Sequence, residues 1–587
     1  MITALAVVAG TTSLHANSTS TPPNILVLLT DDQGWGDNEA NCDNSTGMCA
    51  RTPNLATLMR SKHTASFHRF YAAASVCSPT RAAILTGRTN NRDCIDGALP
   101  CCNENPAPGC SMGKYGGLPW TEFTIAKAAK KSELGDYATF HLGKWHLGDL
   151  WDKKLPGMSP GKWSVSNPGH HGFDEWLATQ AEASNSMSNC GCFPVNHTDP
   201  GPRPPSGYPM ITPHGDQCVV GGGSPSDWCY PCTNYYQPNA SDPRNVSDLS
   251  HRVAGDDSTF LVQQFERFLL QQLAAHRPWL AHLCFHAIHE PHPAMPDYYR
   301  RYSKDPDYSG ALEMWDAALG SLLDLLDAHE VAPHTAIFYT TDNGPHQGKE
   351  RSDIHYSTGF LRQCKASVWE GGIRVPGLVY VPWLVHENKN VSTPATTADF
   401  LPTIMGLLQV TSDNPSWVVD GVDLIPLIGA SPAQSHGRLQ LPGAEPHSAA
   451  AAGAAKGGYL PRDVPIGFDC TFGQHALIDN NWKLVHNPGK GQCTFQPPYA
   501  TWHNLSSVYL LFDIDTDPHE LHDLSRSEPA HLARMRKALD AFLASVEHSQ
   551  ANETHCGKFA PSPPTSVELP TSHENECGPS TVCQQSS

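Results

Sequence analysis

Apolar residues along this chain follow two patterns, short continuous runs and longer stretches with helical spacing. Runs of strand length predict buried β-strands over residues 24–30, 137–142, 278–286 and 335–341. Apolar residues three or four positions apart predict amphipathic helices over 121–131, 257–276 and 311–330. Because strands and helices alternate, we expect an α/β domain with a large, mainly parallel sheet flanked by helices.

The pattern changes after an Ala- and Gly-rich tract at 443–458. Beyond it, 475–486 and 509–519 predict strands of a smaller antiparallel sheet, and 529–548 predicts a closing helix. The expected organisation is a main domain over 23–440 with a Pro-, Gly- and Cys-rich insert over 151–250, a smaller α+β domain over 459–550, and an irregular Cys-containing tail over 556–587.

Composition narrows the cellular setting and the partners. The 39 Lys and Arg against 58 Asp and Glu give a net charge of −19, which argues against nucleic acid and anionic membranes as general partners. Nineteen cysteines predict a secretory-pathway protein with disulfides, in an extracellular or lysosome- or vacuole-like compartment. Asn-x-Ser/Thr sequons agree with that route and occur at Asn17, Asn44, Asn196, Asn239, Asn245, Asn390, Asn504 and Asn552.

The N-terminal segment 1–20 is apolar and ends in small residues, so it predicts a signal peptide although it lacks a basic start. No later run has the length of a membrane span, and we therefore expect no membrane-spanning segment.

Oxygen-bearing side chains directly follow two of the predicted strands. Asp31 and Asp32 follow 24–30, while Asp342 and Asn343 follow 335–341. Such oxygens are the ligands that calcium and magnesium prefer, and strand ends of an α/β sheet are common ligand sites. Each turn alone could equally be a solvated acidic loop.

Two other predicted strands also lead into reactive side chains. Lys144 and His146 follow 137–142 and would share one side of an extended segment, offering a charge for a tetrahedral anion and a proton-exchanging imidazole. Three histidines follow the apolar part of 278–286, of which His289 fits an active-site role best; His286 and His292 are the alternatives.

The segment Cys77-Ser-Pro79-Thr-Arg81 predicts the start of a helix. Proline is tolerated in the first helical turn, and Gly87 suits the helix end. Cys77 would then lie at the positive end of the helix, with Arg81 one turn further on. By itself this motif is also compatible with an ordinary disulfide cysteine.

These motifs together resemble the sulfatase family, in particular its arylsulfatase-like members within the alkaline-phosphatase-like superfamily. The resemblance rests on Cys-x-Pro-x-Arg at 77–81, Thr-Asp-Asp at 30–32, Gly-Lys-Trp-His-Leu-Gly at 143–148, Asp-Asn-Gly at 342–344, and Lys365 five residues before Glu-Gly-Gly-x-Arg-x-Pro. It covers nearly the whole chain after the N-terminal segment and implies the sulfatase fold.

The resemblance also implies a mechanism. Cys77 would be oxidised by a formylglycine-generating enzyme during maturation, and the formylglycine hydrate would attack sulfate monoesters of small molecules or glycans. The residues implied for catalysis are Cys77, Arg81, Lys144, His146, His289 and Lys365. The ligands implied for one calcium ion are Asp31, Asp32, Cys77, Asp342 and Asn343. After conversion of Cys77, eighteen cysteines would remain and could all pair.

Two alternatives remain open. One is a phosphate or phosphonate ester hydrolase on the same fold, although a Thr or Ser at position 77 would favour it more than a cysteine does. The other is a non-catalytic secreted binding protein that keeps Cys77 unconverted. The sequence does not distinguish aryl sulfates, sulfated glycans and sulfolipids as substrates.

Overall fold

The structure is a computed structural model of the 587-residue chain. It describes residues 21–42, 51–93, 117–148, 166–179, 257–289, 306–346, 357–411, 418–429, 464–470, 473–487 and 509–552, with single residues and short strands between these ranges. The predicted signal peptide, the tract 443–458, the tail 556–587 and His292 lie outside the described residues.

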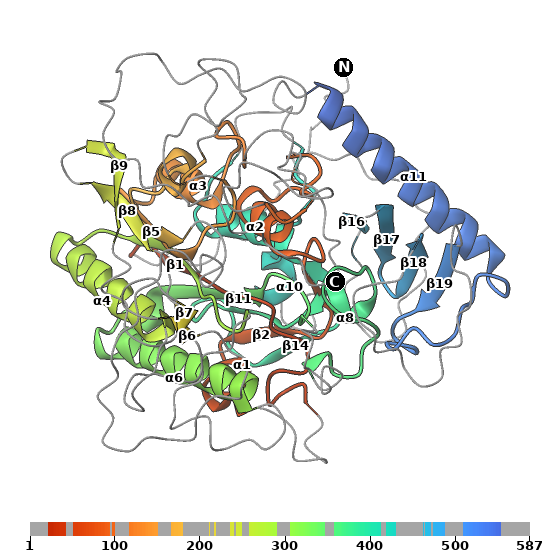
Figure 1. Ribbon diagram of the computed structural model, residues 1–587, viewed down its shortest axis with the longest axis horizontal. Coiled ribbons are helices and arrows are strands. Elements are labelled where there is room, and N and C mark those ends of the chain that lie inside the picture. Colours follow the sequence, from red (N-terminus) through yellow and green to blue (C-terminus); the bar gives the residue numbers. More distant parts are fainter. Residues whose placement is uncertain are drawn as a thin grey trace, which may run out of the picture.

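A ten-stranded sheet forms the centre of the molecule (Figure 1). Its order is β14 (Lys389–Val391), β2 (Thr64–Phe67), β13 (Gly377–Tyr380), β11 (Thr335–Thr341), β1 (Asn24–Thr30), β10 (Trp279–Cys284), β4 (Ala138–Lys144), β5 (Glu175–Thr179), β8 (Tyr236–Asn239) and β9 (Asp242–Asp248). The five central strands, from β11 to β5, are parallel. The predicted α/β class with a mainly parallel sheet is therefore confirmed.

Helices cover both faces of this sheet, and β1 shows why. Ile25, Val27 and Leu29 of β1 belong to one buried cluster, whereas Leu26 and Leu28 belong to another. A strand buried on both sides has no polar face, which explains its continuous aliphatic sequence. The first cluster includes α2 (Cys77–Thr86), α3 (Ile125–Lys131) and α9 (Phe400–Leu407); the second includes α1 (Pro53–Arg60), α4 (Asp257–Ala275) and α6 (Pro306–Ala328).

Two predicted segments differ from the structure. The helix expected from 121 begins at Ile125, because the Thr124 side chain accepts a hydrogen bond from the Lys127 N–H and caps it there. The insert 151–250 also contributes to the core: β5 pairs with β4, and Trp176 to Thr179 are buried. The remaining short strands and α-helices are β3 (Phe70–Tyr71), β6 (Met210–Ile211), β7 (Gln217–Cys218), β12 (Arg374–Val375), β15 (Ala395–Thr396), α8 (Glu370–Ile373) and α10 (Ile425–Gly429).

A smaller antiparallel sheet follows, as expected for the C-terminal part. It consists of β16 (Ile466–Cys470), β17 (Gln474–Asp479), β18 (Trp482–His486) and β19 (Tyr509–Asp513). One face packs on α11 (Pro529–Asn552), and the other packs on residues of the main domain that include Val368 and Trp369. Figure 1 shows this sheet and α11 beside the large sheet.

A buried ion cluster joins the small sheet to the main domain. Lys483 Nζ on β18 lies 2.8 Å from Glu370 Oε1 and 2.8 Å from Glu520 Oε1. The Glu370 N–H also donates to Glu520 Oε2 at 2.8 Å. Arg374 Nη1 also lies 3.5 Å from Glu370 Oε2, so Glu370 contacts two cations, whereas the Glu520 carboxylate contacts only Lys483 among the described cations. A proton on Glu520 would therefore lower the cost of burying its carboxylate.

We expect Glu520→Gln to change how stability depends on pH. Burial, reinforced by Glu370 and opposed by Lys483, raises the pKa of Glu520 from 4.5 to about 7. The folded state then holds this proton more tightly than the unfolded state, so stability falls as pH rises from about 4.5 to 7. The variant should gain about 3 kcal/mol relative to the parent protein across that window in chemical denaturation. Glu547→Gln, at an exposed position of α11, is the control and should show no such gain. A pH-independent difference for Glu520→Gln would contradict this account.

Candidate active site

Adjacent parallel strands bring the predicted polar residues to one edge of the sheet. β1 and β11 pair in register to their last residues, so the turns that follow them begin side by side. The Asp32 N–H donates to Asp342 Oδ1 at 3.2 Å, and Asn343 Nδ2 donates to Asp32 Oδ1 at 2.6 Å. Asp31, Asp32, Asp342 and Asn343 are all buried, and they meet as the sequence predicted.

Cys77 is the first residue of α2, as predicted from Pro79 and Gly87. The preceding Val76 is extended, and Gly87 ends the helix with a φ of +66°, in the left-handed region that favours glycine. Every residue of α2 is buried. This packing holds Cys77 with its Sγ 3.5 Å from Asp31 Oδ1.

Two cations from different elements meet at Asp31. Arg81 Nη2 lies 3.2 Å from Asp31 Oδ2 and 2.8 Å from Asp342 Oδ2. Lys144 Nζ, at the end of β4, lies 2.5 Å from Asp31 Oδ2. Arg81 Nη1 also donates to the Lys144 carbonyl at 2.9 Å, which ties α2 to β4. Both cations thus form ion pairs with carboxylates that the sequence predicted as metal ligands: Arg81 with Asp31 and Asp342, and Lys144 with Asp31.

The third cation, Lys365, joins Asp32 to Cys77. Its Nζ lies 2.6 Å from Asp32 Oδ1 and 3.4 Å from Cys77 Sγ. The Lys365 backbone N–H donates to the Pro345 carbonyl at 3.0 Å, which anchors its loop beside the turn after β11. The lysine that the sequence motif predicted for the site therefore lies beside Cys77.

Glycine allows that loop to approach the turn. A Cβ on Gly344 would lie 2.0 Å from the Gly371 carbonyl oxygen, so no larger residue fits there. Arg374 stabilises the same loop: its Nη2 donates to the His68 carbonyl at 2.7 Å, and its guanidinium stacks over the Trp35 ring. This supports the prediction that Arg374 holds the loop rather than binding substrate.

The electrostatics of the site depend on burial and on these cations. Burial alone would raise the pKa of Asp31, but Lys144, His289, Arg81 and Lys365 together lower it well below its usual range. Burial, with Asp31 and Asp342, instead raises the pKa of the Cys77 thiol well above its usual value. The thiol is therefore protonated at neutral pH, which makes unmodified Cys77 a poor nucleophile.

The residues present fit a hard divalent cation. Asp31, Asp32, Cys77 and Asp342 each offer a donor atom, all within 4.8 Å of one another. Two further oxygens, Asp32 Oδ2 and Asn343 Oδ1, are buried and make no hydrogen bond to any described residue. Buried oxygens without partners are costly, and a cation would satisfy them.

His146 lies differently from the prediction. The expected extended segment is interrupted, because His146 has a φ of +55°. Its Nε2 donates to the Leu99 carbonyl at 2.9 Å, and the Leu99 N–H donates to Ser78 Oγ at 2.9 Å. His146 is thus linked to the residue beside Cys77. Because a carbonyl only accepts, a neutral His146 carries its proton on Nε2 and its lone pair on Nδ1.

The structure describes two of the three candidate histidines, His286 and His289, and places them differently. His289 Nε2 lies 3.7 Å from Asp32 Oδ2, at the rim of the carboxylate group. His286 is instead held by Asp257 Oδ2 at 2.5 Å and Thr179 Oγ1 at 2.7 Å, away from that group. Of the two described histidines, His289 is the one that reaches the site.

Two features of the structure were missed from the sequence, one in this site and one outside it. His346 contributes to lowering the pKa of Asp32, after Lys365 and His289 and against the effect of burial. The sequence could have indicated His346, because it lies two residues beyond Gly344 in the turn that follows β11. Cys77 was also expected to be the one unpaired cysteine, and this was wrong: Cys284, buried in β10, is free as well.

The structure is an α/β fold whose central parallel strands end at a buried group of carboxylates beside Cys77. The sulfatase family model matches residues 23–410. Rat steryl-sulfatase is 27% identical over 576 residues, which cover 90% of each chain. Human N-acetylgalactosamine-6-sulfatase is 28% identical over 557 residues, covering 92% of this chain and 87% of that one. The PsFucS1 sulfatase from Pseudoalteromonas sp. superposes with a TM-score of 0.62 at 20% identity, covering 91% and 92% of the two chains.

This chain belongs to the sulfatase family. It is a sulfatase, an enzyme that hydrolyses sulfate esters. No helix among the residues that the structure describes is long and apolar enough to span a membrane.

Proposed function

We propose that residue 77 is the nucleophile of this sulfatase, after a formylglycine-generating enzyme has oxidised the Cys77 thiol to an aldehyde. The main support is the surroundings of Cys77, an unbridged cysteine whose Sγ lies between a carboxylate of Asp31 and the ammonium of Lys365. Once hydrated, the aldehyde would supply two hydroxyls, one to accept the sulfo group and one to help expel sulfate.

Two of the three cations, Lys144 and Lys365, would neutralise negative charge on the reacting sulfate. Lys144 and Lys365 end in ammonium groups that can donate to sulfate oxygens, and both lie within 3 Å of site carboxylates. Arg81, held by Asp31 and Asp342 from inside the fold, would position those carboxylates and balance their charge.

Two histidines would move the protons. His289, at the partly exposed rim, would donate a proton to the departing alcohol oxygen. His146 would act at the second stage, where its Nδ1 would take a proton from the remaining hydroxyl of residue 77. The bond from His146 Nε2 to Leu99 supports this assignment because it fixes the basic lone pair on Nδ1.

A single calcium ion would be held by Asp31, Asp32, residue 77, Asp342 and Asn343. When bound, it would supply positive charge next to the nucleophile and the sulfate oxygens. The oxygen-rich donor set and the two buried oxygens without partners support calcium over a soft metal.

Mass spectrometry of the peptide that contains residue 77 tests the proposal. Protein secreted by a eukaryotic host should carry an aldehyde or its hydrate there. An intact thiol or a disulfide at Cys77 in active protein would overturn the proposed nucleophile.

The substrate would be a sulfated small molecule or glycan. The two relatives cover similar shares of this chain yet are named for a steryl and an amino-sugar substrate. A panel of aryl, steryl and glycan sulfates is therefore the appropriate assay.

Cys42 and Cys364 are disulfide-bonded, which supports maturation in the secretory pathway and an extracellular or lysosome-like destination.

His289→Ala should slow hydrolysis in a way that depends on the leaving group. Loss of a general acid should lower kcat about 10²-fold for alkyl or sugar sulfates, and much less for nitrophenyl sulfate, whose leaving group needs no proton. His286→Ala is the matched control because His286 contacts Asp257 and Thr179 instead of the site carboxylates. An equal loss on both substrate types in His289→Ala would contradict its role as the acid.

A further inference from the structure

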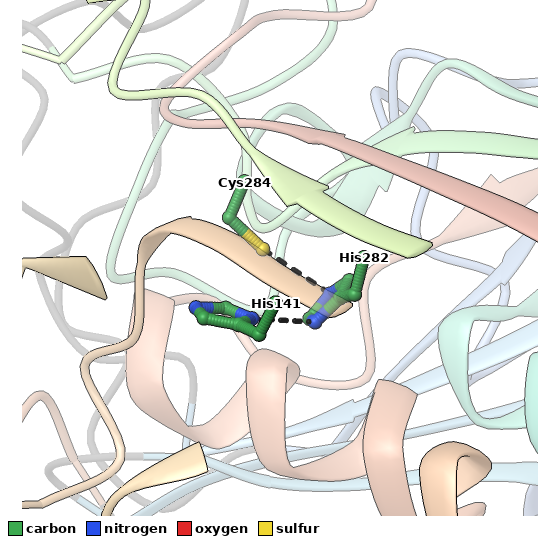
Figure 2. A group of neighbouring side chains, drawn as sticks. All are labelled: His141, His282 and Cys284. Atoms are coloured by element: carbon green, nitrogen blue, oxygen red, sulfur yellow. Dashed lines mark hydrogen bonds between the residues drawn. The ribbon is translucent and has the colours of Figure 1, made fainter. Parts of the chain in front are cut away.

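A second group of side chains that could hold a metal ion lies on one face of the large sheet. His141 is on β4, and His282 and Cys284 are on the neighbouring strand β10. The register pairs His141 with His282 and Gly143 with Cys284, so one face of the two strands carries three donor side chains and one position without a side chain. Figure 2 shows the three side chains turned toward one another.

The three side chains are in direct contact. His141 Nδ1 lies 3.1 Å from His282 Nδ1, and Cys284 Sγ lies 3.1 Å from His282 Nε2 (Figure 2). One donor atom from each residue falls within 4.8 Å of the others. The two contacts use different nitrogens of His282, and only one of these could bind an ion. Metal–ligand bonds of zinc size place donor atoms about 3.3–3.8 Å apart, so side-chain shifts of about 1 Å would bring one atom from each residue around an ion.

The contacts within the cluster use both nitrogens of His282 but only one nitrogen of His141. All three residues are almost completely buried, and His141 Nε2 makes no hydrogen bond to any described residue. Cys284 is free in a chain that forms disulfides elsewhere, for example at Cys42 and Cys364. Phe173 stacks on His282, and Trp145 packs edge-on against His141, which gives the cluster an apolar, water-excluding wall.

The charge of the surroundings selects the kind of ion. Burial, helped by Arg81, lowers the pKa of His282 to about 3, and burial also lowers the pKa of His141, so both imidazoles are neutral and can donate lone pairs. With a Cys284 thiolate, Cu(I) gives a complex of zero net charge, whereas Zn(II) leaves one positive charge. Burial against the rings of Trp145 and Phe173 disfavours that extra charge, whereas the charge of Arg81 is balanced by Asp31 and Asp342.

We propose that His141, His282 and Cys284 form a buried site for one soft d¹⁰ cation, Cu(I) in preference to Zn(II). Two imidazole nitrogens and one thiolate are the ligands that such ions prefer. Binding would release one proton, from the Cys284 thiol, with no change in oxidation state. The site is separate from the oxygen-rich group at Asp31 and does not depend on the sulfatase mechanism.

Anaerobic titration of the full-length, metal-stripped protein with Cu(I) tests the site. A coloured Cu(I) chelator as competitor should report one bound Cu(I) per chain, and X-ray absorption should show one sulfur and two nitrogen ligands. Cys284→Ala should lower the Cu(I) affinity by more than about 100-fold, because it removes a direct ligand. Cys77→Ala, which replaces the other buried free cysteine, should leave the affinity unchanged.

If Cys284→Ala does not fold, the X-ray absorption spectrum still tests the proposal, because that measurement needs only the parent protein. Absence of a sulfur ligand, or no stoichiometric Cu(I) binding, would overturn the proposal. Unchanged affinity in folded Cys284→Ala, loss of binding in Cys77→Ala, or tighter binding of Zn(II) than of Cu(I) would do the same.

Discussion

Replacing Cys77 with serine is expected to turn the enzyme into a single-turnover reagent. A serine hydroxyl can occupy the same place at the start of α2 and accept the sulfo group. It has no second hydroxyl with which to expel sulfate, so the ester would persist. Steady-state hydrolysis should fall by about 10⁴-fold or more, as for loss of other essential nucleophiles. Intact-peptide mass spectrometry should show one sulfo group on residue 77 after incubation with substrate.

Cys77→Ala provides the control for this experiment. Alanine removes the nucleophile altogether, so both turnover and the covalent adduct should be absent. Both variants keep a small side chain at a fully buried helix position, and thermal unfolding should confirm that both fold. Multiple turnovers by Cys77→Ser at a rate near that of the parent protein would show that a second hydroxyl is not required.

The site could be predicted largely because parallel strands end at a common edge. Asp31, Asp32, Asp342 and Asn343 each follow an apolar run, and the pairing of β1 with β11 brings the two turns together. The helix at Cys77 could likewise be predicted, since Pro79 and Gly87 mark its two ends. In these cases a local pattern and the tertiary structure require the same conformation.

Local patterns failed where the decisive contact was distant. The positive φ of His146 accompanies a bond to Leu99, 47 positions away in the sequence. β5 is short and lies among Pro- and Gly-rich segments, so only its pairing with β4 makes it a core strand. The contact between His141 and His282 depends on the register of β4 against β10, which neither strand encodes alone.

Charge balance at the active site leads to the last prediction. Its carboxylates and its cations are equal in number, namely Asp31, Asp32 and Asp342 against Arg81, Lys144 and Lys365. The group is thus close to neutral without a metal, and the two lysines are engaged by carboxylates. Calcium would take those carboxylates, release the ammonium groups for sulfate, and leave the pocket with about two excess positive charges.

Asp32→Asn should therefore weaken calcium binding and catalysis together. The change keeps the size of the side chain but removes a charge and can replace a ligand oxygen that makes no hydrogen bond to any described residue. We expect kcat/KM to fall by about 10³-fold or more, equivalent to the several kcal/mol that a metal contributes. Calcium at 100 times its Kd should stabilise the parent protein by about 2.7 kcal/mol, and the variant much less at that concentration. Asp316→Asn, at a carboxylate that accepts hydrogen bonds from Asn54 and Leu55, is the control for loss of a buried acid. If Asp32→Asn kept the calcium-dependent stabilisation and the activity, Asp32 would not be a ligand.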